Sequence, residues 1–173
     1  MVNENTLAFQ DMGGGSNMLP KSERPKIIDM RCRLTTASQS DYFRQRTQHS
    51  GAYDSINAFK DGSIESFFRD LDEAGVTTAV SVSGMNKGMT LGHSVFPERT
   101  TSNDEQAQIQ KENPARFVAC AGIDAWGVFH DPLEEIERCK KLGFKVVFIE
   151  PGRGPNYADN LADPRLYPIY QKC

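Results

Sequence analysis

Short apolar segments alternate along this chain with segments whose apolar residues recur at helical spacing. The predicted strands are residues 26–31, 77–82, 117–123 and 144–150. The predicted helices are residues 64–74, 103–111, 132–142 and 164–170. Strands that alternate with helices in this way favour parallel pairing through right-handed crossovers.

Residues that commonly begin or end helices support these boundaries. The N-cap candidates are Ser63, Asp131 and either Ser102 or Asn103, and the C-terminal candidates are Gly75 and Gly143. The strand at 144–150 is nearly all apolar apart from Lys145. Such a composition is typical of a strand that is covered on both faces.

The pattern as a whole predicts an α/β fold of four βα units, which is half of a (β/α)8 TIM barrel. A complete barrel needs about 250 residues, and this chain has 173. The long connections, 35–61 and 83–101, follow strands, which places a site at the carboxyl ends of the strands. We predict a flexible tail at residues 1–25, which contain a glycine run, and a partial barrel domain at 26–173.

Two arginines at i, i+2 spacing lie at the end of the first predicted strand and just after it. In an extended strand Arg31 and Arg33 lie on the same face. Two guanidinium groups on one face repel each other unless an anion lies between them. They predict either a clamp for a substrate carboxylate or phosphate, or an ion-pair network with Asp29, Glu150 or Asp124.

Other candidate site residues lie near the predicted strand ends. Glu150 is a candidate general base, although two nearby arginines would lower the pKa of its carboxyl and favour a structural role. His93 and His49, in the two long loops, could transfer protons or lie in solvent. Ser83 and Asp124 could bind substrate or stabilise turns.

Several segments together resemble the amidohydrolase-related family, a (β/α)8-barrel group that includes aminocarboxymuconate-semialdehyde decarboxylase. The segments that carry the resemblance are 29–33 (Asp-Met-Arg-Cys-Arg), 71–80, 103–105, 113–118, 121–124, 142–147 and 163–170. The resemblance implies a hydrolase or decarboxylase that acts on a small carboxylic acid or lactone.

The first of these segments departs from the family pattern Asp-x-His-x-His, in which both histidines bind a divalent metal such as zinc. Arg31 and Arg33 stand at the histidine positions, and a guanidinium has no free lone pair for a metal. We therefore expect no metal cofactor. The family's remaining ligand and its catalytic aspartate would lie beyond Cys173, so we expect an N-terminal half that is inactive alone.

An alternative is a non-catalytic half-barrel that binds a small anion or assembles with a partner. A four-stranded parallel sheet has two open edges, so we expect a homo-oligomer or docking with a missing C-terminal half. The net charge of −3 gives no indication of nucleic acid binding. We expect no membrane association and a cytoplasmic location, because neither a long apolar run nor a secretory signal is present. Four scattered cysteines predict buried, reduced thiols.

Overall fold

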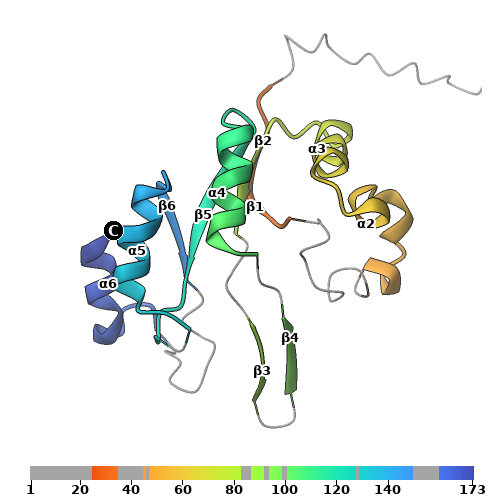
Figure 1. The fold of residues 1–173 in the computed structure, drawn as a ribbon. Coiled ribbons are helices and arrows are strands. Elements are labelled where there is room, and N and C mark those ends of the chain that lie inside the picture. The colour runs from red at the N-terminus through yellow and green to blue at the C-terminus, as the bar shows by residue number, and fades with distance from the viewer. Residues whose placement is uncertain are drawn as a thin grey trace, which may run out of the picture.

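The computed structural model describes residues 25–34, 45, 47–82, 87–91, 94–98, 101–127, 129–149 and 160–173. The tail predicted at 1–25 lies almost entirely outside these residues. The central sheet consists of β1 (Ile28–Cys32), β2 (Thr78–Ser81), β5 (Phe117–Ile123) and β6 (Val146–Ile149), in the order β1-β2-β5-β6. All three strand pairs are parallel (Figure 1). The predicted fold class, four parallel strands in a curled half-barrel, is confirmed.

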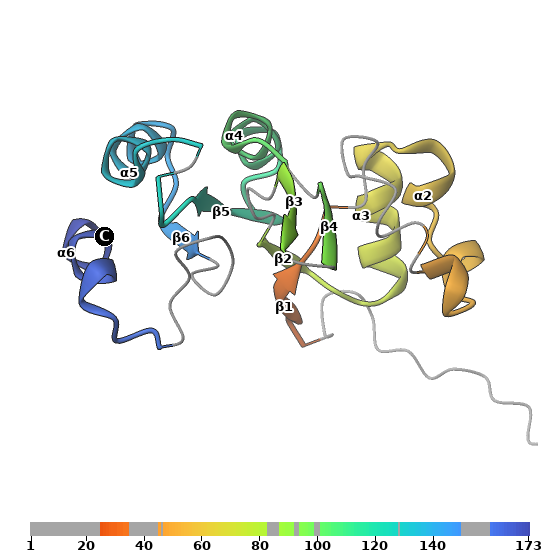
Figure 2. The same ribbon diagram turned by 90° about the horizontal axis from the view of Figure 1, so that it is seen from below.

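The helices after the strands cover one face of the sheet. These helices are α3 (Ile64–Glu73), α4 (Asn103–Glu112) and α5 (Pro132–Lys141). Figure 2 shows them in a row along one side of the strands. Shorter elements are η1 (Tyr53–Ser55), α2 (Ala58–Asp61), η2 (Pro164–Leu166) and α6 (Tyr167–Lys172). The face opposite the long helices is the one that lines the interior of a closed barrel.

The helix boundaries follow the predicted capping residues. The Ser63 side chain accepts a hydrogen bond from the backbone N–H of Ser66, and Asp131 caps α5 in the same way. At α4 the N-cap is Ser102, which resolves the alternative left open by the sequence. Gly75 and Gly143 have φ values of +75° and +92° after α3 and α5, a conformation that a side chain disfavours.

The main hydrophobic core lies between the sheet and its helices. Side chains of β5 alternate between the two faces, so Phe117, Ala119 and Ala121 join the core under the helices. Phe117 is fully buried and makes an edge-to-face contact with Phe67 of α3, with ring centroids 6.4 Å apart. On the opposite face a smaller cluster contains Val80, Val82 and Cys120, with Val118 and Phe148 packed against it.

Buried amide side chains attach α4 to the sheet. Asn103 forms a reciprocal pair with the backbone of Gly122, donating to its carbonyl at 3.0 Å and accepting from its N–H at 2.8 Å. Gln106 accepts a hydrogen bond from the Ser81 hydroxyl at 2.9 Å. These bonds satisfy polar groups that are buried, where an unpaired group is costly.

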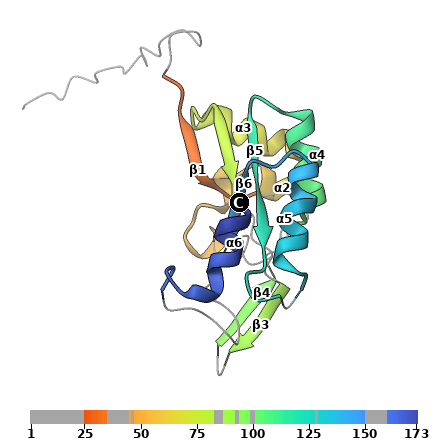
Figure 3. The ribbon, with the colours of Figure 1, turned by 90° about the vertical axis from the view of Figure 1, so that its left-hand side faces the viewer.

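Two expectations need correction. Residues 83–101 were predicted to be a loop, but β3 (Lys87–Leu91) and β4 (Ser94–Glu98) form an antiparallel pair within them. Figure 3 shows this hairpin beyond the carboxyl ends of the sheet strands. The sequences of the two strands, Lys-Gly-Met-Thr-Leu and Ser-Val-Phe-Pro-Glu, contain glycine and proline, which are depleted in strands and gave no strand signal. Secondly, β6 is at an edge of the sheet and Val146 is 38% exposed, so the strand is not covered on both faces.

The four cysteines are free, and Cys32, Cys120 and Cys139 are buried as predicted, whereas Cys173 is exposed. Burial raises the pKa of Cys32 and of Cys139 to about 12, and that of Cys120 to about 11. Such thiols are poor nucleophiles near neutral pH. Within the described ranges, no helix is both long enough and apolar enough to cross a membrane.

Candidate functional site

An irregularity in β1 determines which of its side chains face the barrel interior. Asp29 pairs with Ala79 and Cys32 pairs with Ser81, so β1 contains one more residue than β2 over this interval. Such an extra residue is a β-bulge. Cys32 and Leu34 lie in the core under the helices. Arg33, between them, therefore points to the interior face.

The guanidinium of Arg33 lies at the carboxyl ends of the strands and contacts two other strand segments, one directly after β2 and one in β6. Its Nη1 donates a hydrogen bond to the carbonyl oxygen of Val82, directly after β2. Its central carbon lies 5.6 Å from the centroid of the Phe148 ring in β6. A cation over an aromatic face is stabilised by the ring quadrupole. These contacts hold the half-buried Arg33 side chain across the interior face.

Gly122 provides space for this arrangement. In the β5–β6 register Gly122 pairs with Phe148, so both lie at the same level of the sheet. Because Gly122 has no side chain, nothing on β5 at that level separates Phe148 from the strands on the other side. The side chain of Arg33 can therefore reach the Phe148 ring from β1.

Arg31 differs from Arg33 in its surroundings. Its side chain is exposed, and no ion pair with another described residue involves it. Its backbone N–H donates to Oδ1 of Asp29 at 2.9 Å. The bulge lies beside Arg31, so simple alternation does not fix the direction of its side chain relative to Arg33. The clamp formed by both arginines remains a prediction.

Asp124 stabilises the turn after β5. Its two carboxylate oxygens accept hydrogen bonds from the backbone N–H groups of Trp126, at 3.1 Å, and Phe129, at 2.7 Å. Its own N–H donates to Nε2 of His130 at 3.0 Å. This is the turn role that the sequence allowed as an alternative to substrate binding. His130 has the structural role that its position before a helix N-cap suggests.

Three candidate residues, Glu150, His93 and Ser83, lie outside the described residues. Glu150 follows Ile149 of β6 in the sequence, and Ser83 follows Val82, so two of them adjoin the segments that contact Arg33. Their roles as catalytic or substrate-binding residues stay predictions. His49 is described and is exposed at the end of a helical turn.

The described residues do not fit a divalent metal at this position. In the part of the chain that the structure describes, no group of three or more His, Cys, Asp or Glu side chains could hold a metal ion. Arg31 and Arg33 offer positive N–H donors where a metal requires lone pairs. No step proposed below involves a metal.

The sequence prediction missed Phe148 and the carbonyl of Val82. A spacing signal for Phe148 was present, because it precedes Glu150 by two residues and so shares its face in an extended strand. The Val82 carbonyl had no such signal, since a backbone acceptor depends on strand register rather than residue type.

Comparisons with known proteins support the fold. No protein-family model matches this chain, and neither does any curated protein. Among solved structures, an uncharacterized TIM-barrel protein from Bordetella bronchiseptica matches with a TM-score of 0.61 and 21% identity, covering 86% of this chain and 52% of that one. 4-Oxalomesaconate hydratase from Rhodopseudomonas palustris matches with a TM-score of 0.51 and 19% identity, covering 84% of this chain and 48% of that one.

These similarities define the class of fold, which is that of the TIM barrel. At such low identities they show the fold alone. The chain spans about half the length of the solved structures that it matches. Its four βα units therefore correspond to half of a barrel.

Proposed function

We propose that this chain forms half of the substrate-binding mouth of an amidohydrolase-like TIM-barrel enzyme. The enzyme would be a hydrolase or carboxy-lyase acting on a small anionic substrate, such as a carboxylic acid or a lactone. Arg33 binds the substrate anion, and Arg31 adds a second positive charge. The observation that carries the proposal is the guanidinium of Arg33, oriented by Val82 and Phe148 at the carboxyl ends of the strands.

The chemistry of arginine supports an anionic ligand. A guanidinium has five N–H donors in a planar fork that matches a carboxylate. The ring of Phe148 and the apolar cluster around Val80 and Cys120 reduce the local dielectric, which strengthens a charge-assisted hydrogen bond. An apolar body with a carboxylate group would match this surface.

The location supports an enzyme more than a structural role. TIM-barrel enzymes place their active sites at the carboxyl ends of the strands. One similar structure is named a hydratase of 4-oxalomesaconate, an organic acid anion. In a hydrolysis or hydration, arginine would stabilise negative charge that develops on a substrate oxygen. Arg33 cannot act as the base, so another group, with Glu150 as the predicted candidate, would have to accept the proton.

A binding experiment tests the role of Arg33 directly. Small mono- and dicarboxylic acids would be titrated into the chain by calorimetry. We expect saturable binding that weakens at least about tenfold in Arg33→Ala, the loss of one charge-assisted hydrogen-bonded pair. Arg33→Lys should recover less than half of the binding free energy that is lost in Arg33→Ala, because an ammonium lacks the planar fork of a guanidinium.

A matched control is Arg69 of α3, an exposed arginine that donates to Ser66 of the same helix at 2.7 Å. Arg69→Ala should leave the affinity unchanged. If Arg69→Ala weakens carboxylate binding as much as Arg33→Ala does, the affinity depends only on the overall charge of the chain, and the proposed site is refuted. We further expect no turnover of carboxylic acids or lactones by the purified 173-residue chain, because the metal-binding histidines and the catalytic aspartate that the family resemblance implies have no counterpart in these residues.

A further inference from the structure

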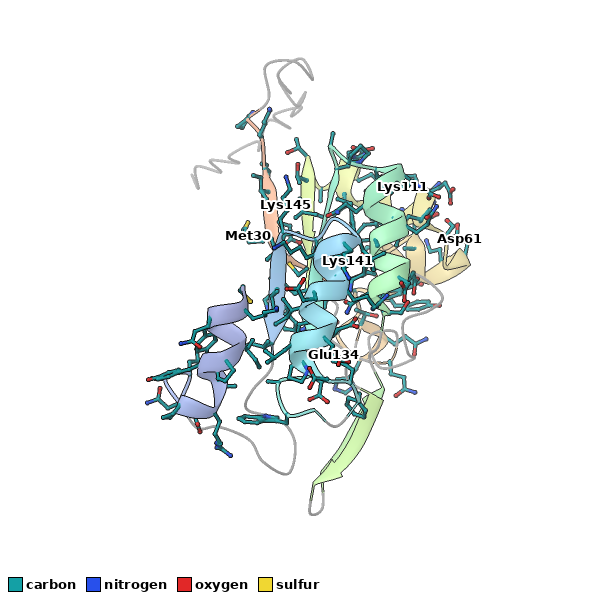
Figure 4. The ribbon with its side chains drawn as sticks, turned by 60° about the vertical axis from the view of Figure 1, so that its left-hand side comes forward. Met30, Asp61, Lys111, Glu134, Lys141 and Lys145 are labelled. Atoms are coloured by element: carbon teal, nitrogen blue, oxygen red, sulfur yellow. The ribbon has the colours of Figure 1, made fainter. Side chains whose placement is uncertain are left out.

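Exposed apolar side chains are concentrated at the two ends of the sheet. Eight large apolar residues are exposed in the described part of the chain. Seven of them lie on or next to β1, or on β6 and the segment around α6: Ile27, Ile28, Met30, Val146, Leu161, Tyr167 and Tyr170. The eighth, Leu142, lies after α5. Figure 4 shows Met30 pointing from β1 away from α4 and α5. Such a concentration marks an interaction surface.

The two ends are also sheet edges. Among the described residues, β1 pairs only with β2 and β6 only with β5. Both edge strands are parallel to the rest of the sheet and have similar lengths, of five and four residues. Backbone N–H and C=O groups along such edges form a template for a further strand.

Helix α6 extends beyond the β6 edge. Figures 1 and 2 both place α6 past β6, at the end of the row of elements. Ile169 of α6 and Leu166, which directly precedes this helix, lie in the core, whereas Tyr167 and Tyr170 of α6 are 47% and 41% exposed. In a TIM barrel each helix covers the strands beside it. The exposed side of α6 is therefore available to cover a strand next to β6.

We infer that two copies of this chain associate so that β6 of each copy pairs, in parallel, with β1 of the other. The product is a closed barrel of eight strands with a twofold axis along its centre. Closure removes both open edges of each copy at once. The interior face of each half then faces the interior face of the other.

A second copy of this chain matches the missing part in size and direction. The similar TIM-barrel structure is covered over 52% of its length and the hydratase over 48%, so two copies of the aligned region equal one barrel. In a barrel the strand beside β6 must be parallel to it, and β1 of a second copy meets that requirement. The twofold arrangement forms both seams from the same pair of edges.

The dimer would also complete the mouth described above. Arg33 of each copy would face a common interior, so that each half supplies one of two cationic groups. This inference does not depend on the proposed enzyme function, because the dimer can form whether or not Arg33 binds a carboxylate.

The mass of the chain in solution is the first test. The 173-residue chain should sediment at about twice its 19.3 kDa, with a concentration-dependent shift to the monomer at low concentration. Val146→Lys, in the edge strand β6, should raise the dissociation constant of the dimer at least tenfold. Leu142→Lys is the matched control, because Leu142 and Val146 are both 38% exposed. Leu142→Lys should leave the mass unchanged.

A charge-exchange experiment tests which edges meet. The dimer of the Val146→Lys variant and the dimer of the Met30→Glu variant should each have a dissociation constant at least tenfold higher than that of the unmodified chain. Mixed together they should form a heterodimer that is tighter than either variant alone, because one seam then pairs Lys with Glu and the other is unmodified.

Three results would overturn the inference: a monomer at all concentrations up to about 100 μM, a dimer that neither edge variant weakens, or equal weakening by Leu142→Lys. Pairing between β6 and β1 would also be refuted if Val146→Lys and Met30→Glu are both folded by circular dichroism but form no dimer, either when they are mixed or at higher concentration.

Discussion

The two faces of the sheet differ in how they are built. On the face covered by α3, α4 and α5, 17 of the described residues form the buried core, among them Phe117 and Leu166, which are fully buried. On the interior face, within the same described part of the chain, the cluster has three buried residues, Val80, Val82 and Cys120. The charged side chain of Arg33 lies on the interior face. Stability is therefore concentrated on one face, and the chemistry proposed for this protein is on the other.

The difference follows from the alternation of side chains in parallel strands. Residues 117, 119 and 121 of β5 lie under the helices, while residues 118 and 120 lie on the interior face. A substitution on one face should thus leave the other largely unaffected.

The largest effect is expected for Phe117→Ala. Phe117 is fully buried, and removing such a ring should lower the free energy of unfolding by about 3–5 kcal/mol. Phe148→Ala, on the half-buried interior face, should cost less than about 1.5 kcal/mol. Urea denaturation of both variants measures the two losses. Equal losses would contradict the separation of a stable face from a functional one.

Asn103→Ala tests the attachment of α4 to the sheet. It leaves the buried N–H and C=O of Gly122 without their side-chain partner, at a cost of about 1–3 kcal/mol. Gln108→Ala, at an exposed position of the same helix, should change stability by less than about 0.5 kcal/mol. If the two variants unfold at the same urea concentration, the buried amide pair contributes nothing specific.

Acid should remove a contribution from Glu135. Hydrogen bonds from Arg138 and then from Asn103 lower the pKa of this carboxyl to about 2, below its value in the unfolded chain. The stabilisation is therefore complete above about pH 4.5 and is lost as the pH falls toward 2. Because Arg138 is 43% exposed, solvent screening limits the loss to on the order of 1 kcal/mol.

Glu135→Gln is the matched variant for this pH dependence. It should flatten the stability curve between pH 4.5 and pH 2 relative to the unmodified chain, as measured by thermal unfolding at several pH values. A variant that loses stability with acid as steeply as the unmodified chain would assign the effect to other carboxyls.

The four thiols should differ in how fast they react with an alkylating reagent, a modification that we expect to perturb the structure least. Cys173 is exposed, while Cys32, Cys120 and Cys139 are buried. Desolvation raises the pKa of all four thiols, so exposure is what distinguishes Cys173. Mass spectrometry at pH 8 should show one thiol that reacts quickly and three that react at the rate of unfolding. Rapid labelling of Cys120 would indicate that the interior face opens far more than the helix-covered face.

Much of the fold could be predicted because its signals are local. Ser63, Asp131 and Gly143 act on their own helix ends, and the strand at 117–123 was predicted with the bounds that the structure has. The β3–β4 hairpin was missed because its two strands stabilise each other, and pairing between segments is not a property of either one alone. The exposed edge at Val146 depends on strand order, which the apolar sequence of β6 cannot indicate.

The candidate site was less accessible to prediction for the same reason. Arg33 was identified by its residue type and position. Its contacts with Val82 and Phe148 depend on a one-residue bulge in β1, which reverses the facing of every residue after it. Asp124 could be placed after a strand, but only the geometry of its turn shows that both carboxylate oxygens accept backbone N–H groups.

The Arg33 side chain can be observed directly during ligand binding, which tests the anion site most directly. In nitrogen-labelled protein, the Nε–H signals of arginine side chains can be followed by NMR while a small dicarboxylic acid is added. We predict a saturable shift of the Arg33 signal, with the signal of Arg69 unchanged. A signal of Arg33 that stays fixed at saturating ligand, or one that moves in parallel with that of Arg69, would contradict an anion site on the interior face.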